Sequence, residues 1–336
     1  MSSASPERLR LGIVGGGLVA QVAHLPALRG QEALFDVVAL ADPCAEVREQ
    51  LGRRHGIARA VATHEELLDR DELDAVLVCS PNGHHARATL DALDAGCHVL
   101  VEKPLCLTPW DAGQIVERAV RAARTVQVGY MKRFDPAYEG LTQPLGLRHV
   151  ATMTVDPGIG IKLRPRDFVA PSDSDGDALR RSTAEQVAAA VGSDDPRHVA
   201  PFSDAFLGAL IHDVNLVLGL LDRAGEDVVR VTDAAAAPDG TLAFGTCELS
   251  RGGRWTAAWA LLPGAEDFRE EIRVFGDAGV QSLVLPAPYL GTHSYARQLR
   301  HFHDCIVDGT ACRTPASQGA RDIALLTEMY RRAVAA

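Results

Sequence analysis

The sequence lacks the marks of an exported, membrane-bound or metal-dependent protein. Its seven cysteines form no Cys-x-x-Cys pair and lie mostly among apolar residues, so we expect reduced, mainly structural thiols. Residues 1–8 lack the charged-then-apolar pattern of a targeting segment, and we find no apolar stretch long enough to span a bilayer. We therefore expect a cytoplasmic protein with no membrane role.

Two further features that the sequence lacks reduce the number of possible function classes. The net charge of −10 argues against a nucleic-acid surface, because phosphate binding requires clustered Lys and Arg. The histidines and carboxylates show no compact ligand spacing such as His-x-x-x-His with a nearby acid, so we expect no metal site. Chemistry on a small molecule is the function class that remains.

The 336 residues, 47% of them hydrophobic, are enough for two domains with separate cores. In the first domain, apolar runs without polar alternation predict a doubly wound parallel sheet with helices on both faces. The expected strands lie near 9–14, 36–41, 74–79, 97–101 and 126–129, and the expected helices near 43–54, 84–95 and 109–124.

After residue 145 the pattern changes to alternating apolar and polar residues. This alternation predicts a second, α+β domain with a large, mostly antiparallel open sheet. A tight hairpin turn is expected at residues 276–279, where glycines supply the positive φ. The expected strands lie near 147–156, 227–236, 241–250, 254–262, 268–276 and 279–285, and helices near 293–308 and 316–334 close the chain.

A glycine-rich turn joins the first strand to an apolar helix. It reads Gly15-Gly16-Gly17-Leu-Val-Ala20, which is Gly-x-Gly-x-x-Ala in the strand–turn–helix context of a dinucleotide fingerprint. Gly15 permits the tight turn and Gly17 permits close approach of a pyrophosphate, which would meet free N–H groups at the helix N-terminus. A flexible glycine loop is the alternative interpretation.

Asp42 ends the second strand, where an acid accepts hydrogen bonds from the adenosine ribose. The carboxylate would repel a 2′-phosphate, so the sequence favours NAD and disfavours NADP. The alternative is an acid that only interacts with a helix dipole. After the next long strand come Ser80, Asn82 and His85, at the carboxyl edge where open parallel sheets bind ligands. Capping of the following helix is the alternative role for Asn82.

Lys103 lies between Glu102 and Pro104 at the end of an apolar strand. The proline keeps the chain extended at the lysine, so the side chain is expected to stay at the cleft. A partly desolvated lysine near a nicotinamide has a lowered pKa and can accept a proton from a hydroxyl. An isolated lysine at a strand end would more often be solvated.

Together these motifs resemble the glucose–fructose oxidoreductase, inositol dehydrogenase and rhizopine catabolism family, abbreviated Gfo/Idh/MocA. The resemblance is carried by residues 15–20, 81–85, 95–104 and 128–136. It implies an NAD-binding Rossmann domain over 1–130, and a substrate-binding domain over 131–336 whose open sheet often forms a dimer or tetramer face. The implied cofactor-binding residues are Gly15, Gly17, Leu18, Val19, Asp42, Ser80, Asn82, His85, Glu102, Lys103 and Arg133.

The family's second motif is usually Asp-x-Gly-x-His-x-x-Asp, and the aligned stretch here runs from Gly208 to Asn215. Only His212 is kept. The resemblance implies that Lys103 and His212 are catalytic and that both, with Asn215, bind substrate. Replacement of the family acid by Gly208 is the main departure, and either the chemistry is altered or Lys103 and His212 suffice.

Residues 162–201 look like an insertion with a helix near 178–191. Lys162 and Arg164 form part of a basic run that is a candidate clamp for a substrate carboxylate or phosphate. A solvated strand end is the alternative. We also consider the insertion a candidate lid that excludes water.

The sequence therefore predicts an NAD-dependent oxidoreductase acting on a secondary alcohol or ketone of a sugar, cyclitol or sugar-derived intermediate. Two alternatives stay open. One is a redox-neutral elimination, epimerisation or glycosidic cleavage through transient oxidation by bound NAD. The other is a cofactor-binding sensor without catalysis.

Overall fold

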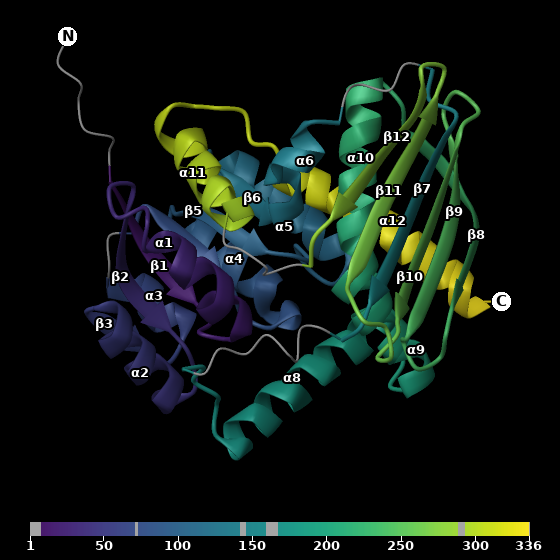
Figure 1. Cartoon of the computed structure of the whole chain (residues 1–336). Coiled ribbons are helices and arrows are strands. Elements are labelled where there is room, and N and C mark those ends of the chain that lie inside the picture. Colours follow the sequence, from purple (N-terminus) through teal and green to yellow (C-terminus); the bar gives the residue numbers. More distant parts are fainter. Residues whose placement is uncertain (1–7, 71–72, 142–145, 159–166, 288–292, 336) are drawn as a thin grey trace, which may run out of the picture.

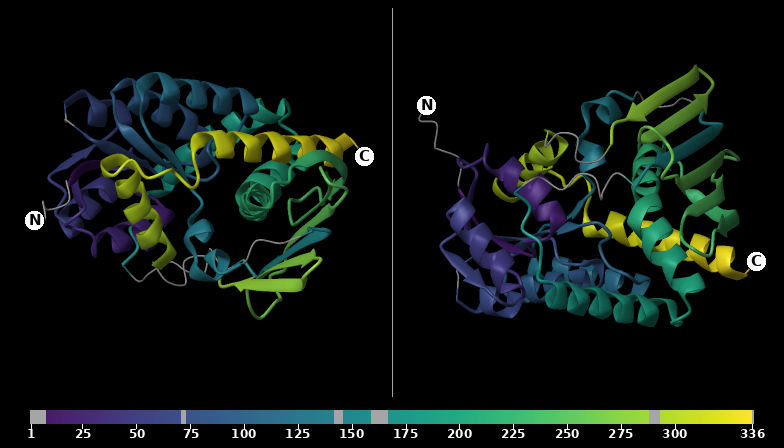
Figure 2. Two further views of the ribbon diagram at one scale, coloured as in Figure 1. Left: turned by 90° about the horizontal axis from the view of Figure 1, so that it is seen from above. Right: turned by 60° about the horizontal axis from the view of Figure 1, so that its bottom comes forward.

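Two six-stranded sheets form the frame of the molecule in this computed structural model (Figure 1). The structure describes residues 8–70, 73–141, 146–158, 167–287 and 293–335. Figure 2 gives two further views, in which the N-terminal sheet and the C-terminal sheet lie at opposite ends of the molecule.

The N-terminal sheet is parallel throughout, with strand order β3-β2-β1-β4-β5-β6. The order reverses between β1 and β4, and such a reversal creates a crevice at the carboxyl ends of the strands. The predicted doubly wound sheet is confirmed, and the sequence analysis misses only the short strand β3. The strands are β1 (Leu9–Val14), β2 (Phe35–Ala41), β3 (Arg59–Val61), β4 (Ala75–Val78), β5 (His98–Glu102) and β6 (Val126–Gly129).

Helical segments connect these strands. The first is π-helical where it follows the glycine-rich turn. Turns of π-helix are rare in proteins, and those that occur are often found at functional sites. These segments are η1 (Ala20–His24), α1 (Leu25–Leu28), α2 (Ala45–His55), α3 (His64–Arg70), η2 (Asn82–His84), α4 (His85–Asp94), α5 (Pro109–Ala122), η3 (Met131–Phe134) and α6 (Pro136–Glu139).

The C-terminal sheet is mixed, with strand order β12-β11-β7-β10-β9-β8. Only the β7–β10 pair is parallel, so the prediction of a mostly antiparallel sheet is confirmed. The hairpin turn also forms, with Gly276 opposite Gly279 and a φ of 112° at Gly279. The strands are β7 (His149–Asp156), β8 (Val228–Ala236), β9 (Leu242–Leu249), β10 (Arg254–Leu261), β11 (Arg269–Gly276) and β12 (Gly279–Leu285).

One long helical segment covers the inner face of this sheet. It consists of α9 (Pro196–Ala200), the π-helical η4 (Pro201–Leu210) and α10 (Ile211–Ala224). By length and composition this segment could cross a membrane, which corrects the expectation that no apolar stretch is long enough. However, 83% of its most apolar window is buried inside the protein, because η4 packs on β9 and β10 and α10 packs on α12 (Ala316–Ala335).

Two more helices pack against the N-terminal part of the molecule. Helix α11 (His293–Val307) packs against η3 and α1 of the N-terminal part (Figure 1). Helix α8 (Asp173–Val191) lies along the bottom of the molecule and begins earlier than predicted. The reason is a cap at Ser172, whose hydroxyl accepts a hydrogen bond from the Asp175 N–H at 3.2 Å.

Candidate functional site

The glycine-rich turn lies at the carboxyl end of β1 and has the geometry predicted for it. Gly15 has a φ of 95°, and a Cβ there would lie 2.6 Å from the Cys79 carbonyl oxygen after β4. A Cβ on Gly17 would meet nothing within 4 Å, so the outer side of the turn is open. Leu18 and Val19 follow at once as the first helical residues. The turn thus leaves room for a phosphate group beside a helix N-terminus.

Asp42 connects the end of β2 to this turn. Its carboxylate accepts hydrogen bonds from the N–H of Gly16 at 2.8 Å and of Cys44 at 2.9 Å. Burial raises the pKa of Asp42, while these two backbone donors act in the opposite direction. A carboxylate with two oxygens keeps acceptor capacity for further donors such as ribose hydroxyls. Asp42 therefore lies beside the turn, where the sequence predicts it.

The segment after β4 carries three predicted cofactor residues. The Ser80 hydroxyl is buried and has no hydrogen-bond partner among the described residues. Asn82 opens the short helix η2. The His85 ring is buried between two carbonyl oxygens, with Nδ1 2.6 Å from that of Pro104 and Nε2 2.8 Å from that of Ser80. His85 thus joins the segments that follow β4 and β5.

Lys103 reaches across from the N-terminal sheet to the long inner helix. Its ammonium donates a hydrogen bond to the Gly208 carbonyl oxygen in η4 at 2.8 Å. Burial lowers the pKa of Lys103 to about 8, helped by the nearby charge of Lys132 and opposed by Glu102. The lysine is therefore close to the protonation balance that general acid–base catalysis at neutral pH requires. The peptide bond between Lys103 and Pro104 is cis.

The structure adds a partner for Glu102 that the sequence analysis misses. His24 in η1 is fully buried, and its Nε2 lies 2.7 Å from Glu102 Oε1. The other carboxylate oxygen accepts a hydrogen bond from the Lys103 N–H at 3.2 Å. Glu102 is thus oriented from both sides. In the sequence, His24 is only a histidine in a mostly apolar helix. This pattern does not identify Glu102 as its partner.

His212 is the second residue of α10, just after the end of η4, and is buried. Its Nδ1 is buried and has no hydrogen-bond partner among the described residues. Burial lowers the pKa of His212 well below its usual value, and the charges of Lys132 and Lys103 lower it further. The ring is therefore neutral at pH 7. A neutral imidazole with an unpaired nitrogen is suited to hydrogen bonding with a hydroxyl group.

A buried group of charged residues lies behind His212 and was not predicted. Lys132 in η3 forms an ion pair with Glu270 on β11. Asp213, next to the histidine, is 1% exposed and accepts a hydrogen bond from the Thr154 hydroxyl at 3.3 Å. Burial raises the pKa of Asp213 well above its usual value, and the charge of Glu270 adds to this effect. Of these residues, Lys132 acts on both candidate catalytic groups, because its charge lowers the pKa of Lys103 and of His212.

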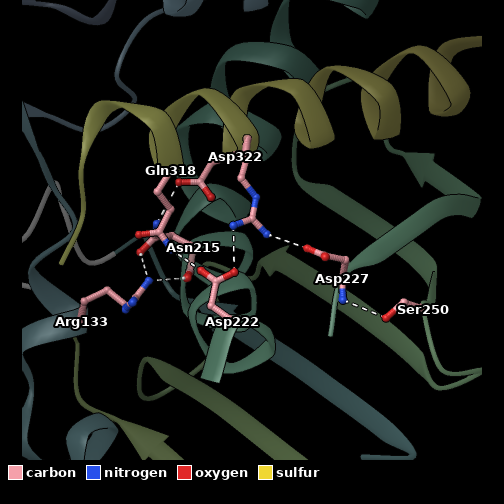
Figure 3. Close-up of polar contacts among 8 residues, drawn as sticks. Arg133, Asn215, Asp222, Asp227, Ser250, Gln318 and Asp322 are labelled. Carbon is pink, nitrogen blue, oxygen red and sulfur yellow. Dashed lines mark hydrogen bonds and ion pairs between the residues drawn. The ribbon is translucent and has the colours of Figure 1, made fainter. Parts of the chain in front are cut away.

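Arg133 and Asn215, two further predicted site residues, face a polar network between α10 and α12 (Figure 3). Arg133 Nη1 donates to the Asn215 backbone oxygen at 3.1 Å, and its guanidinium lies over the Tyr138 ring. The Asn215 amide, fully buried, donates to Asp322 at 2.8 Å. Burial raises the pKa of Asp322 to about 7. The contacts in this network hold helices together and do not by themselves bring either residue to the nucleotide turn.

The insertion packs on the nucleotide turn. The Gln21 amide nitrogen donates to the Gly16 oxygen at 2.7 Å and to the Val169 oxygen at 2.9 Å, and its amide oxygen accepts from the Val169 N–H at 2.9 Å. Farther along, Ser182 of α8 lies 3.2 Å from His84 Nε2. The predicted clamp residues Lys162 and Arg164 lie outside the described residues.

These features fit a dinucleotide. The turn has an open outer face at Gly17 and an acid at the end of β2, and the buried Ser80 hydroxyl has no partner in the described part of the chain. The residues that would hold the group are Gly17, Leu18, Val19, Asp42 and Ser80.

An aspartate at position 208, where the family resemblance predicts an acid, is expected to damage the site. A Cβ on Gly208 would lie 2.9 Å from the Ser203 carbonyl oxygen, so the helix must shift and move the carbonyl that holds Lys103. We expect Gly208→Asp to lower the free energy of unfolding by about 1–3 kcal/mol and to reduce turnover. Urea unfolding and turnover assays measure both effects.

Gly113→Asp is the control, because a Cβ at this helical glycine meets nothing within 4 Å. A Gly208→Asp protein as stable as the control, with higher turnover than the wild type, would contradict the expectation.

The N-terminal part of the chain is similar in sequence to known oxidoreductases. Residues 9–130 match the family model GFO_IDH_MocA, described as an oxidoreductase family with an NAD-binding Rossmann fold. An inositol 2-dehydrogenase of Acidothermus cellulolyticus is 32% identical over 178 residues, and the rhizopine catabolism protein MocA of Rhizobium meliloti is 34% identical over 134 residues. The alignments cover 50% and 40% of this chain, and 51% and 41% of those relatives' own lengths.

The fold extends over nearly the whole chain. A crystal structure of scyllo-inositol dehydrogenase from Lactobacillus casei, with NAD(H) and scyllo-inositol bound, matches with a TM-score of 0.74. It covers 97% of each chain at 16% sequence identity. At 16% sequence identity, this match shows that the two proteins share a fold and shows nothing about their substrates.

Proposed function

This chain carries the NAD-binding Rossmann domain of the Gfo/Idh/MocA oxidoreductase family, and on that premise we propose that it is an NAD-dependent dehydrogenase or reductase. Its proposed substrate is a secondary alcohol, or the corresponding ketone, of a sugar, cyclitol or sugar-derived intermediate. The observation that carries the proposal is Lys103, which has a pKa lowered to about 8 and reaches the helix segment just before His212.

In this proposal Lys103 moves the proton and His212 orients the substrate. The bound nicotinamide would supply the hydride acceptor. Lys103 in its neutral form accepts the hydroxyl proton of the alcohol, and its protonated form returns a proton to the ketone in reverse. The bond to the Gly208 carbonyl holds the nitrogen in place. His212, neutral and with an unpaired nitrogen, hydrogen-bonds the reacting hydroxyl.

The arrangement supports NAD as the preferred cofactor. Asp42 is held beside the turn by two backbone N–H groups, so its negative charge is fixed close to the ribose position. A 2′-phosphate there would meet that carboxylate. Asn82, His85, Glu102 and Arg133 remain proposed cofactor residues, and we infer that His85 and Glu102 act by positioning the Lys103 segment. Asn215, Lys162 and Arg164 remain proposed substrate residues.

Turnover assays with NAD or NADP and a panel of sugars and cyclitols test the proposal. Accumulation of reduced cofactor identifies a dehydrogenase. Substrate conversion without it identifies the redox-neutral alternative, and cofactor binding with no conversion of any compound favours the sensor.

The insertion is proposed to slow cofactor release. Gln21 bonds both the nucleotide turn and Val169 of the insertion, so Gln21→Ala should loosen the segment over the turn. Loss of the two hydrogen bonds that join Gln21 to Val169 predicts an NAD dissociation rate raised roughly tenfold. Stopped-flow fluorescence of bound NADH measures this rate.

Gln50→Ala is the matched control, because Gln50 bonds only Glu46 within α2 on the surface. If both variants release NADH at the wild-type rate, the insertion does not retain the cofactor.

A homo-oligomer is proposed to form through the outer face of the C-terminal sheet. Met153 and Val284 are 46% and 54% exposed there and lie on either side of Glu271 in the strand register. Exposed apolar residues on a sheet face that no described helix covers indicate an interaction surface. We expect sedimentation of a dimer or tetramer. A monomer at micromolar concentration would contradict this.

The cytoplasm is the proposed location. All seven cysteines are free thiols in the structure, as expected in a reducing compartment. Cell fractionation would test it, and recovery of the protein outside the cytoplasm would refute it.

A further inference from the structure

The connection from α11 to α12 brings together three side chains that prefer soft metals. His301 and Cys305 are four residues apart on α11 and therefore share one face of the helix. Cys312 lies in the connection that follows. One ligand atom of each residue lies within 4.8 Å of the others. His301 and Cys305 are buried, 8% and 7% exposed, so this is not a solvated surface cluster.

The spacing of these atoms suits a tetrahedral metal. The Cys305 sulfur lies 3.4 Å from His301 Nε2. In a tetrahedral zinc site, with Zn–S of about 2.3 Å and Zn–N of about 2.0–2.1 Å, neighbouring sulfur and nitrogen ligands are roughly 3.5 Å apart. Two thiolates and an imidazole are ligands that zinc and related ions favour. Little rearrangement of this pair would be needed.

The surroundings leave room for a metal and supply a route to it. Cys312 lines a surface groove of about 430 Å³ between α5 and the start of α12. The Cys312 thiol is 3.8 Å from the Gln127 amide oxygen, and the Arg313 N–H donates to His301 Nε2 at 3.1 Å. A metal would replace this last contact, and a water molecule from the groove would complete four ligands.

We propose that His301, Cys305 and Cys312 form a binding site for a thiophilic divalent metal such as zinc. The site contains neither Lys103 nor His212 and is formed by α11 and the connection that follows it. The neighbouring Thr314 hydroxyl donates to the Val128 oxygen of β6 at 2.8 Å, so the segment carrying Cys312 is anchored on the N-terminal sheet. A metal bound there would therefore clamp α11 to the edge of that sheet.

Cobalt(II) titration of the reduced full-length chain tests this site. We expect a thiolate-to-cobalt charge-transfer band that saturates at one equivalent and disappears when zinc is added. Cys305→Ser and Cys312→Ser should each abolish the band. Cys97→Ser should keep it, because that buried thiol bonds the Leu73 carbonyl and is not in the cluster.

A second measurement uses the unmodified sequence and does not depend on the variants folding. Zinc should protect Cys305 and Cys312 from alkylation, read by peptide mass spectrometry, and should raise the unfolding temperature by several degrees. Absence of the band with no protection of these two cysteines would overturn the proposal. So would a Cys305–Cys312 disulfide that, once reduced, leaves a protein unable to bind cobalt.

Discussion

Replacing Lys103 with methionine is expected to lower kcat roughly a hundred- to ten-thousandfold, because the variant keeps the length of the side chain and loses its acid–base group. Binding of NAD should change little, since the proposed pyrophosphate and ribose contacts come from the turn and Asp42. The measurement is steady-state turnover together with calorimetry of NAD binding. Arg331→Met, at an exposed position of α12, is the control and should keep wild-type turnover.

The same residue predicts a pH dependence. Alcohol oxidation requires neutral Lys103, whose pKa is lowered to about 8 by burial. The value of kcat/KM for oxidation should therefore rise with pH and level off above about 8, and this step should vanish in Lys103→Met. A step of the same size in the variant, or turnover equal to the wild type, would remove Lys103 from the mechanism.

The second large effect is expected at Gly15. Alanine there would place a Cβ 2.6 Å from the Cys79 carbonyl oxygen in a backbone with φ of 95°. Since the obstacle is backbone and the conformation disfavours side chains, Gly15→Ala should lower the free energy of unfolding by about 3 kcal/mol or more. NAD binding should be lost with it. Chemical unfolding and calorimetry measure the two effects.

Gly17→Ala separates folding from cofactor binding. Its Cβ would meet no atom within 4 Å, so stability should stay within about 0.5 kcal/mol of the wild type. The methyl group would occupy space that a pyrophosphate needs, so NAD affinity should fall about tenfold or more. A Gly17→Ala protein that binds NAD normally would mean that the phosphates do not approach this turn.

Short sequence motifs were enough to predict the fold of the nucleotide-binding half of the chain. Two features were predictable from residues close together in the chain. They are the buried strand before Gly15 and the position of Asp42 at the end of the next strand. The structure places them as predicted and adds the Asp42–Gly16 bond between them. The hairpin turn was likewise predictable, because Gly279 has a φ of 112°, which glycine adopts without strain.

Contacts between residues far apart in the chain could not be predicted from the sequence. Glu102 is bonded by His24, 78 residues away, and Lys132 by Glu270, 138 residues away. Neither pair has a sequence pattern, because the partners meet only through packing of the two sheets against their helices. Yet Glu102 and Lys132 both shift the pKa of Lys103.

Helix α10 illustrates the same limit of sequence-based prediction. Periodicity places His212 and Asn215 on one face, and a polar face is expected to meet a cleft. Asn215 instead finds Asp322 on α12, 107 residues later, and Arg133 joins them (Figure 3). Helix periodicity identifies the face, while the identity of the facing element depends on tertiary packing.

A parallel assay of NADH and organic product decides whether the protein carries out the proposed Lys103-dependent oxidation. Wild-type protein and Lys103→Met are incubated with NAD and each sugar or cyclitol of a panel, and reduced cofactor and organic product are quantified together. We expect that, with at least one compound, the wild type forms NADH and ketone in equal amounts and Lys103→Met forms almost none. Product without NADH, or NADH formation that does not depend on Lys103, would contradict it.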